Sequence, residues 1–126
     1  MDLNEKLMGM EQATGIPVFP DFAPAQEEKS ITFTYEDERP VLHGNNCPVA
    51  DTAYLQISLY TPEGFDYMPA KHAVRDYLEG AGFSVTSIQS WMDQDLTGTK
   101  RTRHTVFEAN YTEMRKRIRE IRVICA

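Results

Sequence analysis

The chain has 126 residues, 41% of them hydrophobic and 25% charged, a composition typical of one soluble globular domain with its own core. No apolar run approaches the roughly eighteen residues of a membrane-spanning helix. The first residues, MDLNEKLMGMEQ, carry acids where a secretory signal peptide needs basic residues. We therefore expect a single cytoplasmic domain over residues 1–126, with no membrane partner.

The net charge of −6 is unevenly distributed along the chain. Residues 1–99 carry 5 basic and 16 acidic side chains, whereas residues 100–126 carry 8 basic and 3 acidic ones. A body of one sign and an end of the other suit head-to-tail contact between copies, or steering toward a charged partner.

The N-terminal residues predict a helix of about a dozen residues. Asp2 can cap its start, and Gly15 can end it. Its apolar face would consist of Leu3, Leu7 and Met10. Residues 16–20, IPVFP, are apolar, but two prolines confine any strand here to a sheet edge. Residues 21–30 form a polar loop.

Two alternating segments predict strands. Residues 31–35 place Ile31, Phe33 and Tyr35 on one face, and residues 53–60 place Leu55, Ile57 and Leu59 inward. The second strand would turn Tyr54, Gln56, Ser58 and Tyr60 outward. Residues 36–52 are too many for a plain loop in a compact domain. We interpret them as a projecting hairpin arm that turns at residues 44–46.

Residues 61–64, TPEG, predict a turn, after which Asp66 caps a helix that runs to about Glu79. The expected buried face of this helix comprises Ala70, Ala73, Val74, Tyr77, Leu78 and Ala81.

Residues 83–91 predict a third strand with an irregularity near Ser87, and residues 104–111 a fourth strand that pairs with it through a turn at 96–100. Residues 112–126 predict a basic C-terminal helix with an apolar stripe at Met114, Ile118 and Ile121. The predicted fold class is α+β: a small, mainly antiparallel sheet of about four strands with a long hairpin arm, flanked by helices at the N-terminus, in the middle and at the C-terminus.

Residue patterns that carry chemistry are incomplete. His43 and Cys47 lie four residues apart, but zinc normally needs four ligands, or three and a water. The acidic groups at 36–38 and 93–95 are neighbours in single segments, whereas a metal-dependent nuclease needs acids that converge from separate elements. Neither a nucleophile elbow nor a phosphate-binding glycine loop occurs. We expect no catalytic residue, metal, cofactor or small-molecule substrate.

The two cysteines, Cys47 and Cys125, are too few for a disulfide scaffold. A reducing compartment favours free thiols, and a single bridge between them stays open as the alternative.

Candidate interface residues fall into an arm set and a basic set. The arm set is Arg39, Pro40, Val41, Leu42, His43, Asn45 and Asn46. The basic set is Lys100, Arg101 and Arg103 in the hairpin turn, with Arg115, Lys116, Arg119 and Arg122 in the last helix. Three interpretations of the basic set stay open: a solvated face or subunit contact, phosphate binding to nucleic acid, and a membrane-surface helix.

In its order of segments the chain resembles the tail completion proteins of long-tailed phages and prophages, also called tail terminator or head–tail joining proteins. Five segments over about the first 110 residues carry the resemblance: residues 14–18 (TGIPV), 31–40 (ITFTYEDERP), 54–68 (YLQISLYTPEGFDYM), 81–83 (AGF) and 103–108 (RHTVFE).

The resemblance implies an α+β domain that is not an enzyme and that assembles as a ring, commonly a hexamer, on the last turn of the tail tube. It implies three partners: other copies of the chain, the tail-tube protein and the head connector protein. It also implies proximity to DNA, and a location in the bacterial cytoplasm during assembly and later in the virion. The alternative function is a small nucleic-acid-binding or regulatory domain that uses the basic hairpin and the C-terminal helix.

Overall fold

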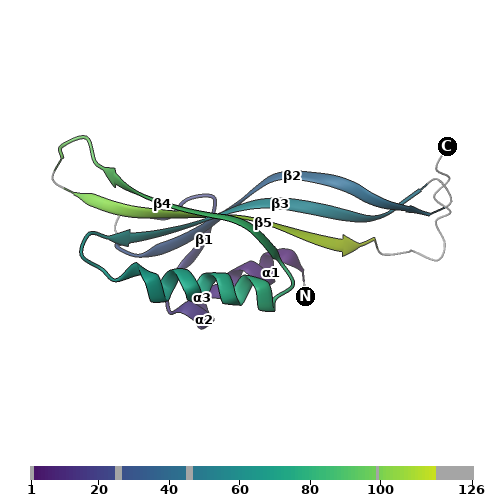
Figure 1. Cartoon of the computed structure of the whole chain (residues 1–126), viewed down its shortest axis with the longest axis horizontal. Helices are drawn as coiled ribbons and strands as arrows, with labels where there is room; N and C mark the ends of the chain where they lie inside the picture. Colours follow the sequence, from purple (N-terminus) through teal and green to yellow (C-terminus); the bar gives the residue numbers. More distant parts are fainter. Residues whose placement is uncertain (1, 25–26, 45–46, 99, 116–126) are drawn as a thin grey trace.

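The computed structural model describes residues 2–24, 27–44, 47–98 and 100–115, without the side chains of 42–44 and 47–49. Three helices and five strands follow one another along the chain (Figure 1). Their bounds are α1 Leu3–Met8, α2 Met10–Thr14, β1 Val18–Pro20, β2 Ser30–Gly44, β3 Cys47–Pro62, α3 Tyr67–Gly80, β4 Ser84–Gln94 and β5 Arg101–Met114.

The strands form one sheet in the order β1-β2-β3-β5-β4, so the fold is α+β with a mixed sheet. The expected number of about four strands is too low, because β1 adds a fifth. It pairs in parallel with β2 through Val18↔Ile31, Phe19↔Thr32 and Pro20↔Phe33. Both prolines around β1 can be accommodated because this short strand lies on the sheet edge, as the sequence predicts.

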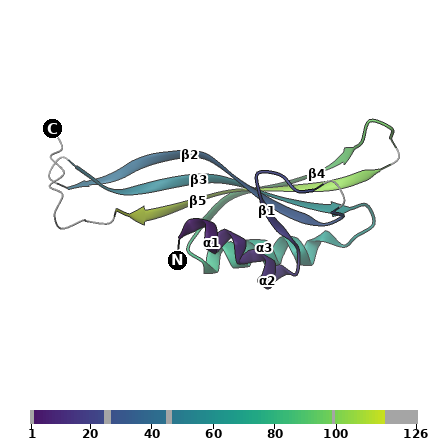
Figure 2. The same ribbon diagram turned by 180° about the vertical axis from the view of Figure 1, so that it is seen from behind.

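All three helices lie on one face of the sheet, as the front and back views agree (Figures 1 and 2). The core lies between them and the sheet, where Leu55, Ile57 and Leu59 of β3 are fully buried, as expected. Phe107 of β5 is paired with Ile57 and is also fully buried. The alternation of β3 therefore brings its large aliphatic side chains to the helix-covered face.

The N-terminal segment forms two short helices instead of the single helix expected. They meet at Gly9, which ends α1 and precedes α2. Asp2 caps α1 by accepting a hydrogen bond from the Glu5 amide at 2.8 Å. Gly15 ends α2 with a positive φ of 73°, the left-handed conformation that glycine adopts most easily.

α3 begins after Asp66, whose carboxylate accepts a hydrogen bond from the Met68 amide, as expected. Val74 and Leu78 are its fully buried residues. The smaller or amphipathic positions of the expected face are half-buried: Ala70, Ala73, Tyr77 and Ala81.

β2 and β3 continue beyond the helix-covered body as a long hairpin, the arm expected for residues 36–52 (Figure 1). Their pairing includes Asp37↔Tyr54, Val41↔Ala50 and Gly44↔Cys47, after a register shift between Tyr35 and Asp37. At about 3.4 Å per residue, the eight steps from residue 36 to residue 44 extend the arm by roughly 27 Å.

β5 corrects the expected C-terminal helix. Thr112–Met114, assigned to that helix, continue β5 and pair with Ala50–Thr52 of β3, so the root of the arm has three strands. The ladder satisfies their backbone groups, so β5 continues three residues beyond the end that the weak apolar period predicts for it. Residues 116–126 lie outside the described residues. β4 and β5 pair as a hairpin, with the expected irregularity between Val85 and Ser87.

The sheet face opposite the helices is partly covered rather than fully solvated. Ser58, expected to point outward, is buried together with its cross-strand neighbours Thr32 and Val106. The loop after β1 borders this region, because residues 21–24 and 27–28 line a pocket of about 290 Å³ with Thr32 and Tyr60.

Candidate interaction surfaces

The described arm residues are largely exposed. Arg39 donates from Nε to Asp37 Oδ2 at 2.7 Å and lies over the ring of Tyr54, 5.5 Å from its centroid. This pairing lowers the pKa of Asp37 and raises that of Arg39. Pro40 is exposed and Val41 half-buried.

The other arm candidates are only partly described. Leu42 and His43 belong to β2, but their side chains lie outside the described set. Asn45 and Asn46 lie outside the described residues, as does any pairing between Cys47 and Cys125.

The basic candidates of the β4–β5 hairpin are already engaged with the body. Arg101 lies 3.6 Å from Glu63, and the guanidinium of Arg103 stacks over Tyr67 of α3, 4.4 Å from the ring centroid. Lys100 is exposed at the end of the turn.

The structure separates the two described parts of the basic set. Arg103 lies near one end of β5, whereas Arg115 follows its other end at the root of the arm (Figure 1). About twelve residues of extended strand separate them, or roughly 35–40 Å. Lys116, Arg119 and Arg122 lie outside the described residues. The described basic side chains therefore form no single patch of the kind that tracks a nucleic-acid backbone.

Arg115 forms a two-pronged ion pair with Asp51. Its Nε and Nη2 donate to the two carboxylate oxygens at 2.9 and 2.7 Å. The hydrogen bond from Arg115 lowers the pKa of Asp51 and raises that of Arg115. Such a two-pronged, charge-assisted contact is among the stronger hydrogen-bonded pairs, and it joins residue 115 to β3.

This ion pair lies at the rim of a hollow between the start of α1 and the underside of the arm. The hollow encloses about 700 Å³, and we call it the notch. It has acidic and apolar lining residues, chiefly Asp2, Leu3, Tyr35, Glu38, Asp51 and Glu113. Among the side chains that line it in the described structure, Arg115 alone is basic.

On the face opposite the helices, three rings from three adjacent strands form a row. Tyr60 of β3 stacks on His104 of β5 at 4.4 Å between centroids, and Trp91 of β4 lies 4.7 Å from the same imidazole. Asp93 accepts from Trp91 Nε1 at 2.8 Å and lies 3.4 Å from His104 Nδ1. Burial lowers the pKa of His104, and Asp93 partly opposes this effect. Its Nε2 atom is buried and has no hydrogen-bond partner among the described residues.

A carboxyl pair lies on the same face. Glu108 of β5 is hydrogen-bonded to Glu36, which occupies the register shift of β2. Burial first, and then the hydrogen bond and charge of Glu36, raise the pKa of Glu108 to about 6.

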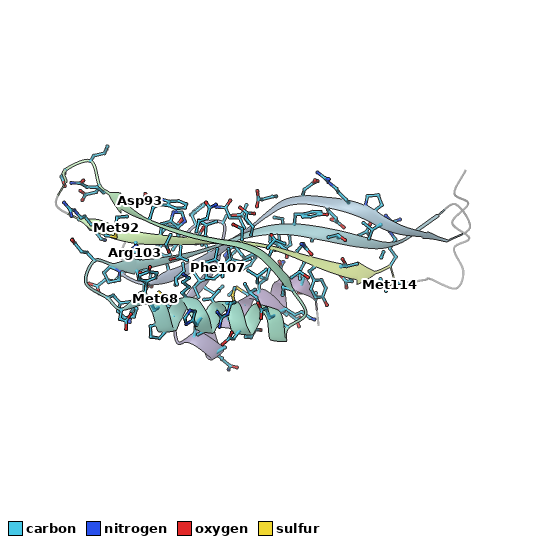
Figure 3. The ribbon with its side chains drawn as sticks, in the orientation of Figure 1. Met68, Met92, Asp93, Arg103, Phe107 and Met114 are labelled. Carbon is cyan, nitrogen blue, oxygen red and sulfur yellow. The ribbon has the colours of Figure 1, made fainter. Side chains whose placement is uncertain are left out.

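The end opposite the arm carries exposed apolar side chains that the sequence did not mark. Met68 of α3 and Met92 of β4 lie near Arg103 there (Figure 3). Phe65 and Leu96 are exposed in the flanking turns. Flexible methionine side chains suit contact surfaces. Both methionines stand in the sequence, but Met92 follows the predicted strand 83–91, and the proximity of the two depends on how α3 packs.

Within the described residues, no group of three or more His, Cys, Asp or Glu side chains is placed to hold a metal ion. No helix in the described part of the chain is long and apolar enough to span a membrane. Comparison with known proteins found no matching family model and no matching curated protein.

Proposed function

We propose that this protein is a structural component of a phage or prophage virion, a tail terminator or tail completion protein that caps the tail tube and joins it to the head through protein–protein contacts. The proposal combines the resemblance of residues 14–108 to that family with the geometry of the arm. The arm is the observation that carries it.

The β2 strand of the arm exposes its side chains from residue 36 to residue 40 in the isolated chain, whereas Ala50 and Thr52 of β3 are buried. Every residue from Thr34 to Pro40 is exposed, although all of them except Glu36 pair with β3. Ordering the backbone of each residue costs about 1–2 kcal/mol of conformational free energy. Exposed side chains bury little surface, so they offset little of this cost. A neighbouring subunit packed against the arm would supply the missing burial.

The distribution of surfaces also supports assembly through unlike contacts. The arm leaves one end of the body, while the apolar and basic groups around Arg103 lie at the other (Figure 3). Two different surfaces at opposite ends suit a heterologous interface, which makes a closed ring when the rotation between copies closes. A hexameric ring in contact with tail-tube and head connector proteins is the form that the resemblance suggests.

The test is electron microscopy of the purified full chain, with light scattering to measure its mass. We expect a homogeneous ring, alone or on purified tail tubes. The matched variant replaces residues 40–51 with Asn-Gly, which joins the directly paired Arg39 and Thr52 by a two-residue turn. It should unfold cooperatively like the parent chain and form no rings.

Rings that form normally without residues 40–51 would contradict the role of the arm. A monomer that never assembles on tubes, yet binds DNA with a steep salt dependence, would contradict the whole proposal and favour the nucleic-acid alternative.

A further inference from the structure

The notch at the root of the arm is a surface with an unbalanced charge. Asp2, Glu38, Asp51 and Glu113 contribute four carboxylates to it, and Arg115 contributes one cation. Lys6 donates to the Tyr111 hydroxyl at 2.7 Å and to the Ala81 carbonyl at 3.2 Å. This lysine is therefore already held by the body.

The notch is also partly apolar. Leu3 and Tyr111 are half-buried and Tyr35 is exposed, so their ring and methyl surfaces face an open space of about 700 Å³. That volume lies within the roughly 300–1,000 Å³ range of ordinary ligand sites and admits several side chains. A fitting occupant carries both cations and aliphatic groups.

The segment that follows Arg115 has this composition. Residues 116–126, KRIREIRVICA, contain four basic side chains, one acidic side chain, and Ile118, Ile121, Val123 and Ile124. The β4–β5 hairpin of another copy is a poorer match: it carries Asp93 and Asp95 beside its cations, and Arg101 lies against Glu63.

We propose that residues 116–126 of the same chain occupy the notch, with their cations against Glu38 and Glu113 and their aliphatic side chains against Leu3 and Tyr35. Arg115 supports this arrangement. It directly precedes the segment, and it is already hydrogen-bonded to Asp51 at the rim of the notch. The inference is independent of any virion role.

The connection through Arg115 favours the chain's own segment over that of a second copy. The segment starts at the rim of the notch, so its eleven residues, each spanning up to about 3.5 Å, reach every part of it. A short tether gives an effective concentration on the order of millimolar, well above the protein concentration of a dilute solution.

The experiment places a nitroxide on Cys125 in the Cys47→Ser variant of the full chain, which leaves one thiol. Amide line broadening is then measured by NMR at low salt, under conditions where light scattering shows a monomer. We expect strong broadening at Leu3, Tyr35 and Ala53, and none at Leu96 and Gly98 in the opposite hairpin.

Two further samples test the charge and the origin of the segment. Glu38→Gln with Glu113→Gln should reduce the broadening at least twofold, whereas Glu28→Gln with Glu79→Gln, which removes the same charge elsewhere, should leave it unchanged. A mixture of isotope-labelled chain without the nitroxide and unlabelled chain that carries the nitroxide should show no broadening.

Three outcomes would overturn the proposal. They are a lack of broadening at the notch, equal broadening at both ends of the molecule, and broadening that appears only in the mixed sample. The last would assign the notch to the segment of a second copy.

Discussion

Tyr77 of α3 lies directly against the backbone of Gly9, at the junction of α1 and α2. Its hydroxyl donates to the Lys6 carbonyl at 2.6 Å. A Cβ atom added at Gly9 would collide with that hydroxyl oxygen. Because φ of Gly9 is −64°, an ordinary helical value, close approach explains the glycine and conformational freedom does not.

Gly9→Ala is therefore expected to destabilise the fold by about 1–3 kcal/mol through overpacking. Combining it with Tyr77→Phe should cost less than the sum of the two single changes, because the clashing oxygen is gone. Denaturant unfolding measures both. Gly80→Ala is the control: no atom lies within 4 Å of its added Cβ, so its effect should be neutral or slightly stabilising. An additive cycle would argue against the Gly9–Tyr77 contact.

Glu108→Gln should stabilise the protein at pH 7.5. The folded-state pKa of Glu108 is raised from 4.5 to about 6, so the folded protein favours the protonated carboxyl. The stability that this preference contributes is fully present below about pH 4.5 and is lost as the pH rises through 6. A glutamine keeps that stability at high pH. One pKa unit corresponds to about 1.4 kcal/mol, and partial solvation reduces the expected gain to about 1 kcal/mol.

Thermal unfolding across pH 4 to 8 checks this prediction. The gain should disappear at pH 4, where Glu108 is protonated in both states. Exposed Glu79→Gln serves as the control. A gain that is the same at every pH would mean that the carboxyl pair is not its source.

Asp93→Asn should lower the pKa of His104 further. Burial already depresses this pKa, and the Asp93 carboxylate is the charge that opposes the effect. Because the folded-state pKa of His104 is depressed, neutral His104 contributes to folding stability above about pH 6.5. This contribution is lost as the pH falls through the folded-state pKa. NMR titration of the imidazole resonances measures the change. Asp76→Asn on α3 should leave the titration unmoved, and an upward shift in Asp93→Asn would contradict the proposed charge interaction.

Phe107→Ala should cost about 3–5 kcal/mol, because its ring is fully buried between the sheet and the helices (Figure 3). Phe22→Ala removes the same ring from a loop position where the side chain is 82% exposed, and it should change stability by less than about 0.5 kcal/mol. Chemical denaturation of both variants gives the comparison. Similar losses in the two would place the core elsewhere.

Arg115→Gln should loosen the end of β5 without unfolding the body. The substitution removes both hydrogen bonds to Asp51 where Glu113 and Met114 pair with the arm. We expect faster hydrogen exchange at these two amides and an unchanged global melting temperature. High salt should reproduce part of the effect in the parent chain. Unchanged exchange rates would show that strand pairing alone holds this end.

Short-range sequence patterns were sufficient to predict much of the fold. The alternation of residues 53–60 identifies the inward face of β3, since a strand repeats every two residues. Asp66 and Gly15 mark helix ends through short-range hydrogen bonding and backbone conformation. The arm follows from the improbable length of residues 36–52 as a loop.

The N-terminal prediction missed the helix break at Gly9, where Tyr77, far away in the sequence, donates to the Lys6 carbonyl. The C-terminal prediction failed at Thr112–Met114, because pairing with Ala50–Thr52 outweighs a short apolar period. In each case the deciding contact joins distant segments.

The candidate surfaces also divide into features that local sequence patterns predict and features that long-range contacts decide. The sequence by itself determined the inward face of β3, the arm and the uneven charge, because these depend on composition and local periodicity. Only the tertiary structure decided that Arg103 and Arg115 lie at opposite ends of β5, that Tyr60, His104 and Trp91 form a row, and that Asp51 receives Arg115. Strand order and register set these distances, and both arise from long-range pairing that no local pattern specifies.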